Sequence, residues 1–202
     1  MTDAVRLVLA TRNRHKVGEI SALLADLPVE ILSFRDFPDL PEVVEDGATL
    51  EENAVKKAEA IAGATGLPSL ADDTGLEVEA LGGAPGVFSA RYAGPEGDYE
   101  ANNEKLLNEL AGVPADRRGA AFRCVVALAL PSGRTRIVEG RTDGRIIEER
   151  RGSAGFGYDP LFVPDGGTRT YAEMTADEKN AISHRGKAIA KGIELVRDLV
   201  CR

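Results

Sequence analysis

The sequence predicts an α/β fold, because strand and helix patterns alternate in its first half and two adjoining strand patterns follow later. The chain has 202 residues, enough for one sizeable core and short for two. With 43% hydrophobic and 29% charged residues, it has the composition of a soluble globular protein. We therefore expect residues 1–202 to form a single domain.

The charge balance excludes several classes of partner. There are 33 acidic and 25 basic side chains, a net charge of −8, which disfavours nucleic acid polymers and anionic membranes. No apolar stretch reaches the roughly eighteen residues that a membrane helix needs, and the N-terminal apolar run is too short for a signal peptide. Cys124 and Cys201 have no motif spacing, so we expect reduced thiols in a cytoplasmic protein.

The first two elements are a strand over residues 5–10 and a helix over residues 16–27, joined by a polar turn. Such a strand-to-helix turn presents backbone N–H groups and the positive end of a helix beside Thr11, Asn13 and Lys16, which suits a phosphate. An ordinary polar connection has the same pattern. The turn alone therefore leaves both interpretations open.

A second strand is predicted over residues 29–34, followed by an acidic, proline-rich loop and a helix that begins with a Thr49–Glu52 capping box and ends at Thr65. Asn53 and Lys57 are four residues apart and share a helix face that could point into a cleft. A solvated surface lysine fits Lys57 equally well, and Glu45 in the loop is as ambiguous.

Two adjacent carboxylates, Asp72 and Asp73, end a short apolar run and are followed by Thr74 and Gly75. On a strand they point to opposite faces, so only one can face a given site unless the backbone turns, which Gly75 permits. Carboxylates without histidine or cysteine partners favour magnesium over zinc. The glycine-rich segment 82–86 then predicts a shaping or subunit-contact loop.

The second half predicts a helix that is capped by Asp98 and runs to Ala111, and an antiparallel sheet. Its strands are expected over residues 120–130 and 135–141, with a further strand over residues 144–150. In the glycine-rich loop 152–165, Phe156 is either buried in the core or open to a flat ligand.

The last helix is predicted from a face that includes Ile189 and Val200, after a Thr175–Glu178 capping box. The pair His184 and Arg185 lies at the helix start, where the dipole disfavours cations. Such a pair is either a surface feature or in need of an anionic or carbonyl-bearing partner. Candidate sites for metal, phosphate and base together indicate a nucleotide.

The chain resembles the inosine/xanthosine triphosphate pyrophosphatase family through five motifs that occur in the family's order between Leu9 and about Lys187. They are ATRNRHKVGEI, EENAVKKA, SLADDTGLEVEALGGAPGVFSARYAG, GFGYDPLFVP and EKNAISHRGKA. The resemblance implies a mixed α/β fold with an elongated central sheet flanked by helices, two lobes with a cleft between them, and a homodimer. It also implies Mg²⁺-dependent hydrolysis of ITP, dITP and XTP to the monophosphate and pyrophosphate.

Residue roles also follow from the resemblance. It implies that Asp73 binds the metal with Glu45 and activates the water, and that Lys57 is catalytic. The implied substrate-binding residues are Thr11, Arg12, Asn13, Arg14, His15 and Lys16 for the phosphates, Thr74, and Phe156, Gly157, Tyr158, Asp159, Lys179, His184 and Arg185 for the base.

Two other functions remain open from the sequence. One is a related nucleotide pyrophosphatase that acts on modified pyrimidine or methylated nucleotides. The other is a regulator that binds purine nucleotides without turnover, although paired carboxylates beside a triphosphate disfavour a pure binder.

Overall fold

The computed structural model describes residues 5–40, 42–95 and 97–200, without the side chains of residues 199 and 200. The strands are β1 (Val5–Leu9), β2 (Val29–Leu32), β3 (Ser69–Val78), β4 (Pro85–Gly86), β5 (Gly119–Ala129), β6 (Thr135–Ile146) and β7 (Phe162–Pro164). The helices are α1 (Arg14–Leu23), α2 (Leu50–Thr65), α3 (Tyr99–Glu109), α4 (Ala176–Ile182) and α5 (His184–Val200). The predictions for the Cys201 thiol and for the Val200 side chain lie outside the described residues.

The described strands form one mixed sheet, in the order β2-β1-β3-β5-β6-β7 with β4 paired to β3. β1 is parallel to both β2 and β3, whereas β4 runs antiparallel to β3 and β7 antiparallel to β6. The predicted α/β class with a mixed sheet is confirmed.

The chain divides into two compact units, and β3, β5 and β6 contribute residues to both. The first unit comprises residues 1–73, 124–140 and 185–202, and the second comprises residues 74–123 and 141–184. The boundary in β3 falls between Asp73 and Thr74.

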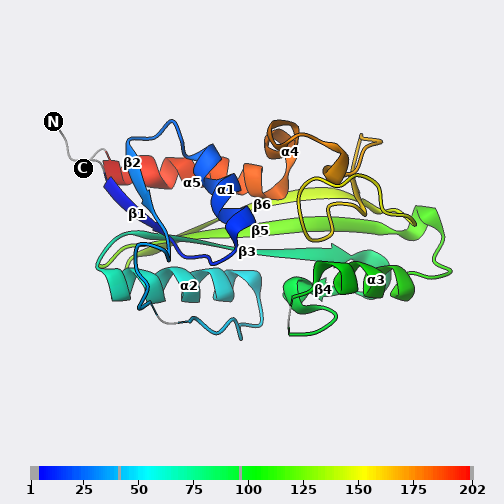
Figure 1. Ribbon diagram of the computed structural model, residues 1–202, viewed down its shortest axis with the longest axis horizontal. Coiled ribbons are helices and arrows are strands. Elements are labelled where there is room, and N and C mark those ends of the chain that lie inside the picture. Colours follow the sequence, from blue (N-terminus) through cyan, green and yellow to red (C-terminus); the bar gives the residue numbers. More distant parts are fainter. Residues whose placement is uncertain (1–4, 41, 96, 201–202) are drawn as a thin grey trace. The chain divides into compact units, whose positions relative to one another are not determined.

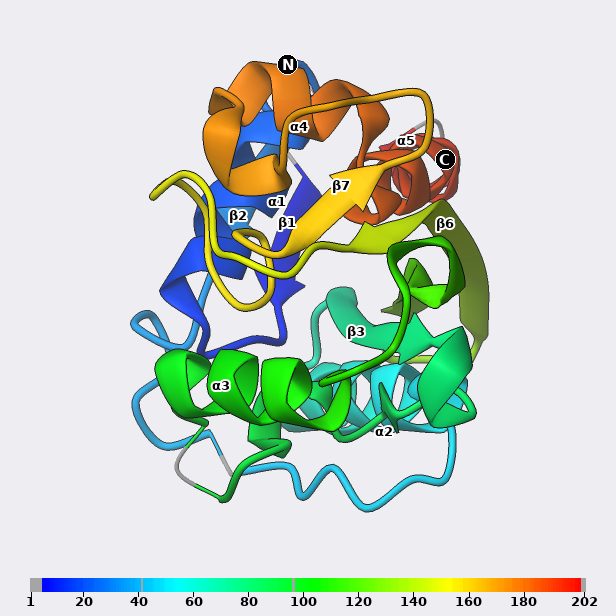
Figure 2. The ribbon, with the colours of Figure 1, turned by 90° about the vertical axis from the view of Figure 1, so that its right-hand side faces the viewer.

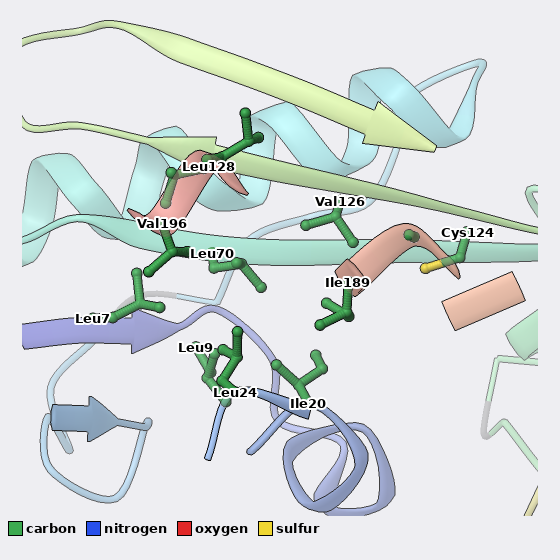
Figure 3. Close-up of a cluster of buried hydrophobic side chains, with 12 residues drawn as sticks. Leu7, Leu9, Ile20, Leu24, Leu70, Cys124, Val126, Leu128, Ile189 and Val196 are labelled. Carbon is green, nitrogen blue, oxygen red and sulfur yellow. The ribbon is translucent and has the colours of Figure 1, made fainter. Parts of the chain in front are cut away.

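In the first unit, α1 and α5 cover one face of the sheet and α2 covers the other (Figures 1 and 2). Leu7, Leu70 and Val126 from the strands pack against Ile20 of α1 and Ile189 of α5 (Figure 3). On the opposite face α2 buries Ala54, Ala58 and Ile61, which have the spacing of one helix face, and Thr65 is half-buried. Periodic apolar spacing therefore identified the packing faces of these helices.

The second unit has its own core beneath α3. Leu106 and Leu110 of this segment pack with Leu76 of β3 and with the aromatic rings of Phe122 and Phe162. Asp98 caps the helix as predicted, accepting from the N–H groups of residues 100 and 101. This core holds the segment 156–161 that carries the candidate base-binding residues, because Tyr158 and Leu161 belong to it.

Several predicted boundaries were wrong. The first helix begins at Arg14 rather than Lys16, and β3 continues through Gly75 without a turn. The strand expected over residues 144–150 is not separate, because residues 144–146 are the end of β6. Position 144 requires a glycine, because a Cβ atom there would be 2.4 Å from the Val163 carbonyl oxygen of β7.

The helix ends also differ in detail from the prediction. Thr49 caps α2 as expected, but the Glu52 carboxylate accepts from Ala48 N–H rather than from Thr49. The Thr175–Glu178 capping box is complete. Among the described residues, no helix is long and apolar enough to cross a membrane.

Candidate active site

Asp72 and Asp73 lie on opposite faces of β3 in the first unit, because side chains alternate along a strand. Asp72 is two residues after Leu70 and so lies on the same face of β3, above the core that α1 and α5 cover. Asp72 also interacts with residues of both helices. Asp73 instead contacts α2. The prediction that only one aspartate can face a given site is consistent with this division.

Asp73 lies in a polar group with the buried side chains of Asn53 and Lys57 and with Glu45, whose side chain is 35% exposed. The Lys57 Nζ atom donates to Glu45 Oε1 at 2.8 Å, to the Asp72 carbonyl oxygen at 2.8 Å and to Asp73 Oδ1 at 3.3 Å. Only 7% of Lys57 is exposed, so it is not a solvated surface lysine. Two carboxylates from distant parts of the first unit thus converge on one ammonium group.

Asn53 connects the acidic loop to the same group. Its Nδ2 atom donates to Asp73 Oδ2 at 3.2 Å, and its Oδ1 atom accepts from Gly47 N–H at 2.8 Å. A Cβ atom on Gly47 would be 2.7 Å from Asn53 Oδ1, so a larger residue would push the loop away. Asn53 therefore helps to hold the segment that carries Glu45 beside Asp73.

The electrostatics of this group follow from burial and proximity. Burial raises the pKa of Asp73 above its usual value, although the cations Lys57 and Lys16 oppose the shift. Burial disfavours the Lys57 ammonium, but Asp73 and Glu45 outweigh it and raise the pKa of Lys57. Lys57 is consequently a cation, and Asp73 is a stronger base than an exposed carboxylate.

Asp72 belongs to a different ion network. Its Oδ2 atom lies 3.0 Å from Lys16 Nζ and 3.2 Å from Arg185 Nε, and the Cys124 thiol is 3.8 Å away. The Arg185 guanidinium also contacts Glu19 at 2.5 Å. Burial opposes the charged form of Asp72, but Lys16 and Arg185 hold its pKa below the usual range. The expected anionic partners of Arg185 at the helix start are thus Asp72 and Glu19.

The turn before α1 is more fully capped than the sequence suggested. Asn13 Oδ1 accepts from the N–H groups of His15 and Lys16 at 3.0 and 3.4 Å, and Thr11 Oγ1 accepts from Asn13 N–H. The amides of His15 and Lys16 are therefore already bonded to Asn13. Arg12 is exposed, donates to the Leu40 carbonyl and lies over the Phe34 ring; Arg14 and His15 are exposed as well.

The second unit brings Phe156, Asp159 and Lys179 together. Asp159 Oδ2 accepts from Phe156 N–H at 2.9 Å and from Lys179 Nζ at 2.7 Å. The same ammonium lies 5.0 Å from the centroid of the Phe156 ring, which is half-buried and also contacts Tyr99. The aromatic ring is thus fixed beside a buried ion pair and is not part of the apolar core.

The remaining predicted residues of this unit are mostly buried. The His184 ring stacks on Phe122 with centroids 4.5 Å apart, and the Tyr158 hydroxyl donates to the Ser89 carbonyl oxygen. Burial raises the pKa of Tyr158, so this hydroxyl remains a donor. Thr74, the first residue of the unit, is half-buried. Arg185 belongs to the other unit, and its role in base recognition stays a prediction.

The first unit offers two carboxylates that fit a magnesium ion. Within residues 5–40, 42–95 and 97–200, no three His, Cys, Asp or Glu side chains gather in a way that could hold a metal. Glu45 and Asp73 nevertheless reach one point, since both contact Lys57 Nζ. Magnesium is commonly held by one or two carboxylates and completed by substrate phosphate and water, so this donor set is sufficient.

Sequence reasoning missed several residues that support the site. Glu19 pairs with Arg185, Phe122 stacks on His184, and Tyr99 and Asn103 of α3 contact Phe156 and Gly157. These partners are far apart in the sequence, and none belongs to a local pattern that distinguishes it from an ordinary helix or strand residue. Only the fold brings them together.

Comparisons with known proteins identify the family of this chain. Residues 7–195 match the model of the Ham1 family. A dITP/XTP pyrophosphatase of Geobacter sulfurreducens is 56% identical over 92% of this chain and 93% of its own, and one of Streptomyces coelicolor is 52% identical over 96% and 98%. A solved HAM1 protein from Coxiella burnetii aligns with a TM-score of 0.87 at 41% identity, covering 96% of this chain and 99% of that one.

Proposed function

Since the chain belongs to the Ham1 family, we propose that it hydrolyses the non-canonical purine nucleotides dITP, ITP and XTP to the nucleoside monophosphate and pyrophosphate. The observation that carries this proposal is the convergence of Glu45 and Asp73 on Lys57. A site that cleaves a phosphoanhydride needs a base and cations within reach of the same phosphate, and this group has both. The whole chain, residues 1–202, acts as one functional domain.

Glu45 and Asp73 are the residues that would hold Mg²⁺, which when bound supplies positive charge to the phosphate oxygens and lowers the pKa of a coordinated water. Asp73 accepts the proton of the water that attacks the α-phosphorus. Its raised pKa suits this task, because a proton acceptor works best when its pKa approaches the working pH.

Lys57 has two roles in this proposal. It holds the two carboxylates together, and its ammonium neutralises negative charge that develops on the phosphate as the bond to pyrophosphate breaks. Thr74 adds a hydroxyl contact to the substrate. Thr11, Arg12, Asn13, Arg14, His15 and Lys16 bind the phosphates, mainly through side chains because Asn13 caps the amides of His15 and Lys16.

The base is recognised by the second unit. Phe156 stacks on the purine, and Gly157, Tyr158 and Asp159 shape its surroundings. His184 or Arg185 donates to the oxygen at position 6, which adenine lacks, and Lys179 completes the recognition of the base. A donor left without an acceptor disfavours adenine by several kcal/mol, about a hundredfold or more.

The proposal also includes the setting of the enzyme. We propose a homodimer in the cytoplasm that removes deaminated purines from the nucleotide pool, with no nucleic acid polymer or membrane as partner. The net charge of −8 supports the latter exclusion, because such a protein is repelled by polyanions.

The test is pyrophosphate release in the presence of magnesium with ITP, dITP, XTP, GTP, ATP and dUTP. We expect turnover of the first three and much weaker turnover of ATP and dUTP. A preference for dUTP or another pyrimidine would contradict the proposal. Thermal stabilisation by ITP without pyrophosphate release would identify a nucleotide-binding regulator instead.

A further inference from the structure

Asn103 occupies an unusual position for an asparagine. It lies inside α3 and is only 2% exposed, although asparagine is a poor helix former. Its Nδ2 atom donates to the Tyr99 carbonyl oxygen one turn earlier at 2.7 Å and to the Gly157 carbonyl oxygen at 2.8 Å. The second bond joins α3 to a segment 54 residues away within the second unit.

In the part of the chain that the structure describes, Asn103 Oδ1 is buried without a hydrogen-bond donor. A buried acceptor without a donor destabilises a protein, so stability alone would favour an apolar residue at this position. The bond to Gly157 is the feature that an apolar residue could not provide.

Gly157 directly follows Phe156, and its backbone is in the left-handed region with φ of +63°. The loop is fixed on both sides of the Phe156 ring: Asp159 accepts from Phe156 N–H, and Asn103 donates to the Gly157 carbonyl oxygen. Tyr99 of the same helix contacts the ring itself, with centroids 5.9 Å apart at an angle of 41°. Through Tyr99 and Asn103, α3 therefore constrains both the ring and the backbone that carries it.

From this geometry we propose that Asn103 is a positioning residue that sets the Phe156 ring for purine binding by anchoring the Gly157 carbonyl. The inference rests on the proposed function in assigning Phe156 to the base. Asn103 acts through Gly157 and makes no contact with substrate. Because stacking contributes equally to the bound substrate and to the transition state, losing this anchor weakens binding and leaves the chemical step intact.

The matched pair Asn103→Ala and Asn102→Ala tests the proposal. Asn102 is the neighbouring residue of α3 and is equally buried, but it bonds to the backbone of Ala90 and Ala93 instead. We expect Asn103→Ala to raise KM for dITP about five- to tenfold with kcat within about twofold of wild type. Asn102→Ala is expected to lower thermal stability and to leave KM within about twofold.

Two further measurements keep the test decisive. Asn103→Leu keeps the branched shape and favours the helix, so it serves if the alanine variant folds poorly. Hydrogen–deuterium exchange without nucleotide measures directly how firmly Asn103 holds the loop. We expect faster amide exchange of residues 154–159 in both Asn103 variants but not in Asn102→Ala.

An unchanged KM in both Asn103 variants, or an equal rise in Asn102→Ala, would overturn the proposal, as would unchanged exchange of residues 154–159. Failure of the proposed function is recognised separately, because wild-type protein would then release no pyrophosphate from dITP. The exchange measurement would still decide in that case whether Asn103 anchors the loop.

Discussion

The Lys57 ammonium lies 3.3 Å from Asp73 Oδ1, and both side chains are only 9% exposed. The same ammonium contacts Glu45 and the Asp72 carbonyl oxygen. A buried cation that joins two carboxylates is costly to desolvate, and its position beside the proposed base supports the catalytic role that we propose for it.

Replacing Lys57 by methionine should strongly reduce turnover. Methionine matches the unbranched lysine side chain as far as Cε but lacks the ammonium that neutralises charge on the phosphate, so we expect kcat for dITP to fall about a hundredfold or more. Lys56→Met is the matched control, because Lys56 is exposed and pairs with the surface residue Asp46. Wild-type kcat in the Lys57 variant, measured on protein shown to be folded by circular dichroism, would rule out its catalytic role.

Substitution of Asp73 should mainly reduce activity, whereas substitution of Asp72 should mainly reduce stability. Asp73→Asn keeps an acceptor for Asn53 but removes the proton acceptor, so we expect turnover to be nearly lost with a modest change in stability. Asp72→Asn removes the charge that faces the half-buried Lys16 and the buried Arg185, and Arg185 then keeps Glu19 as its carboxylate partner, so we expect a destabilisation of about 3 kcal/mol. Urea denaturation and pyrophosphate release distinguish the two, and substantial activity in Asp73→Asn would remove Asp73 as the base.

The Arg169–Glu178 pair at the start of α4 should make stability depend on pH. Arg169 bonds to both carboxylate oxygens and, with the Thr175 N–H, lowers the pKa of Glu178 to about 2. The pKa of Glu178 is lower in the folded state than its unfolded value of about 4.3. The ionised Glu178 therefore stabilises the folded state at a pH above about 4.3, and this stabilisation is lost as the pH falls towards about 2. The stability difference between wild type and Glu178→Gln should therefore shrink between about pH 5 and about pH 2. A difference independent of pH would contradict this.

The parts of the fold that were predictable depend on neighbours in sequence. The buried face of α2 and the caps at Asp98 and Thr175 follow from residues within a few positions of one another. The burial of Lys57 was not predictable, because it depends on Asp73, 16 residues away. The bond between Arg185 and Asp72 spans 113 residues.

Glycines illustrate the same limit of local reasoning. Gly75 permits a turn and Gly144 is the predicted start of a strand, yet both residues lie inside continuous strands. At Gly144 the reason is the close approach of β7, which no local pattern reveals. A glycine in a sequence thus indicates either a special backbone conformation or a close neighbour, and only the structure distinguishes them.

Gly155 and Gly157, on either side of Phe156, allow the effect of a special backbone conformation to be measured separately from the effect of a close neighbour. Both have positive φ, +74° and +63°. A Cβ atom on Gly155 would lie 2.0 Å from Asp159 Oδ2, whereas one on Gly157 would meet nothing within 4 Å. Gly157→Ala should therefore cost only the backbone strain, about 1–2 kcal/mol of unfolding free energy.

Gly155→Ala should cost more, because the displaced Asp159 carboxylate would lose its contact with the buried Lys179. We expect a loss about 2 kcal/mol larger than that of Gly157→Ala, measured by urea denaturation. Lys179→Met in the Gly155→Ala background provides the check, since the two changes should be less than additive if both act on the same ion pair. Full additivity would mean that the Gly155 effect is confined to the backbone and that Asp159 keeps its contact with Lys179.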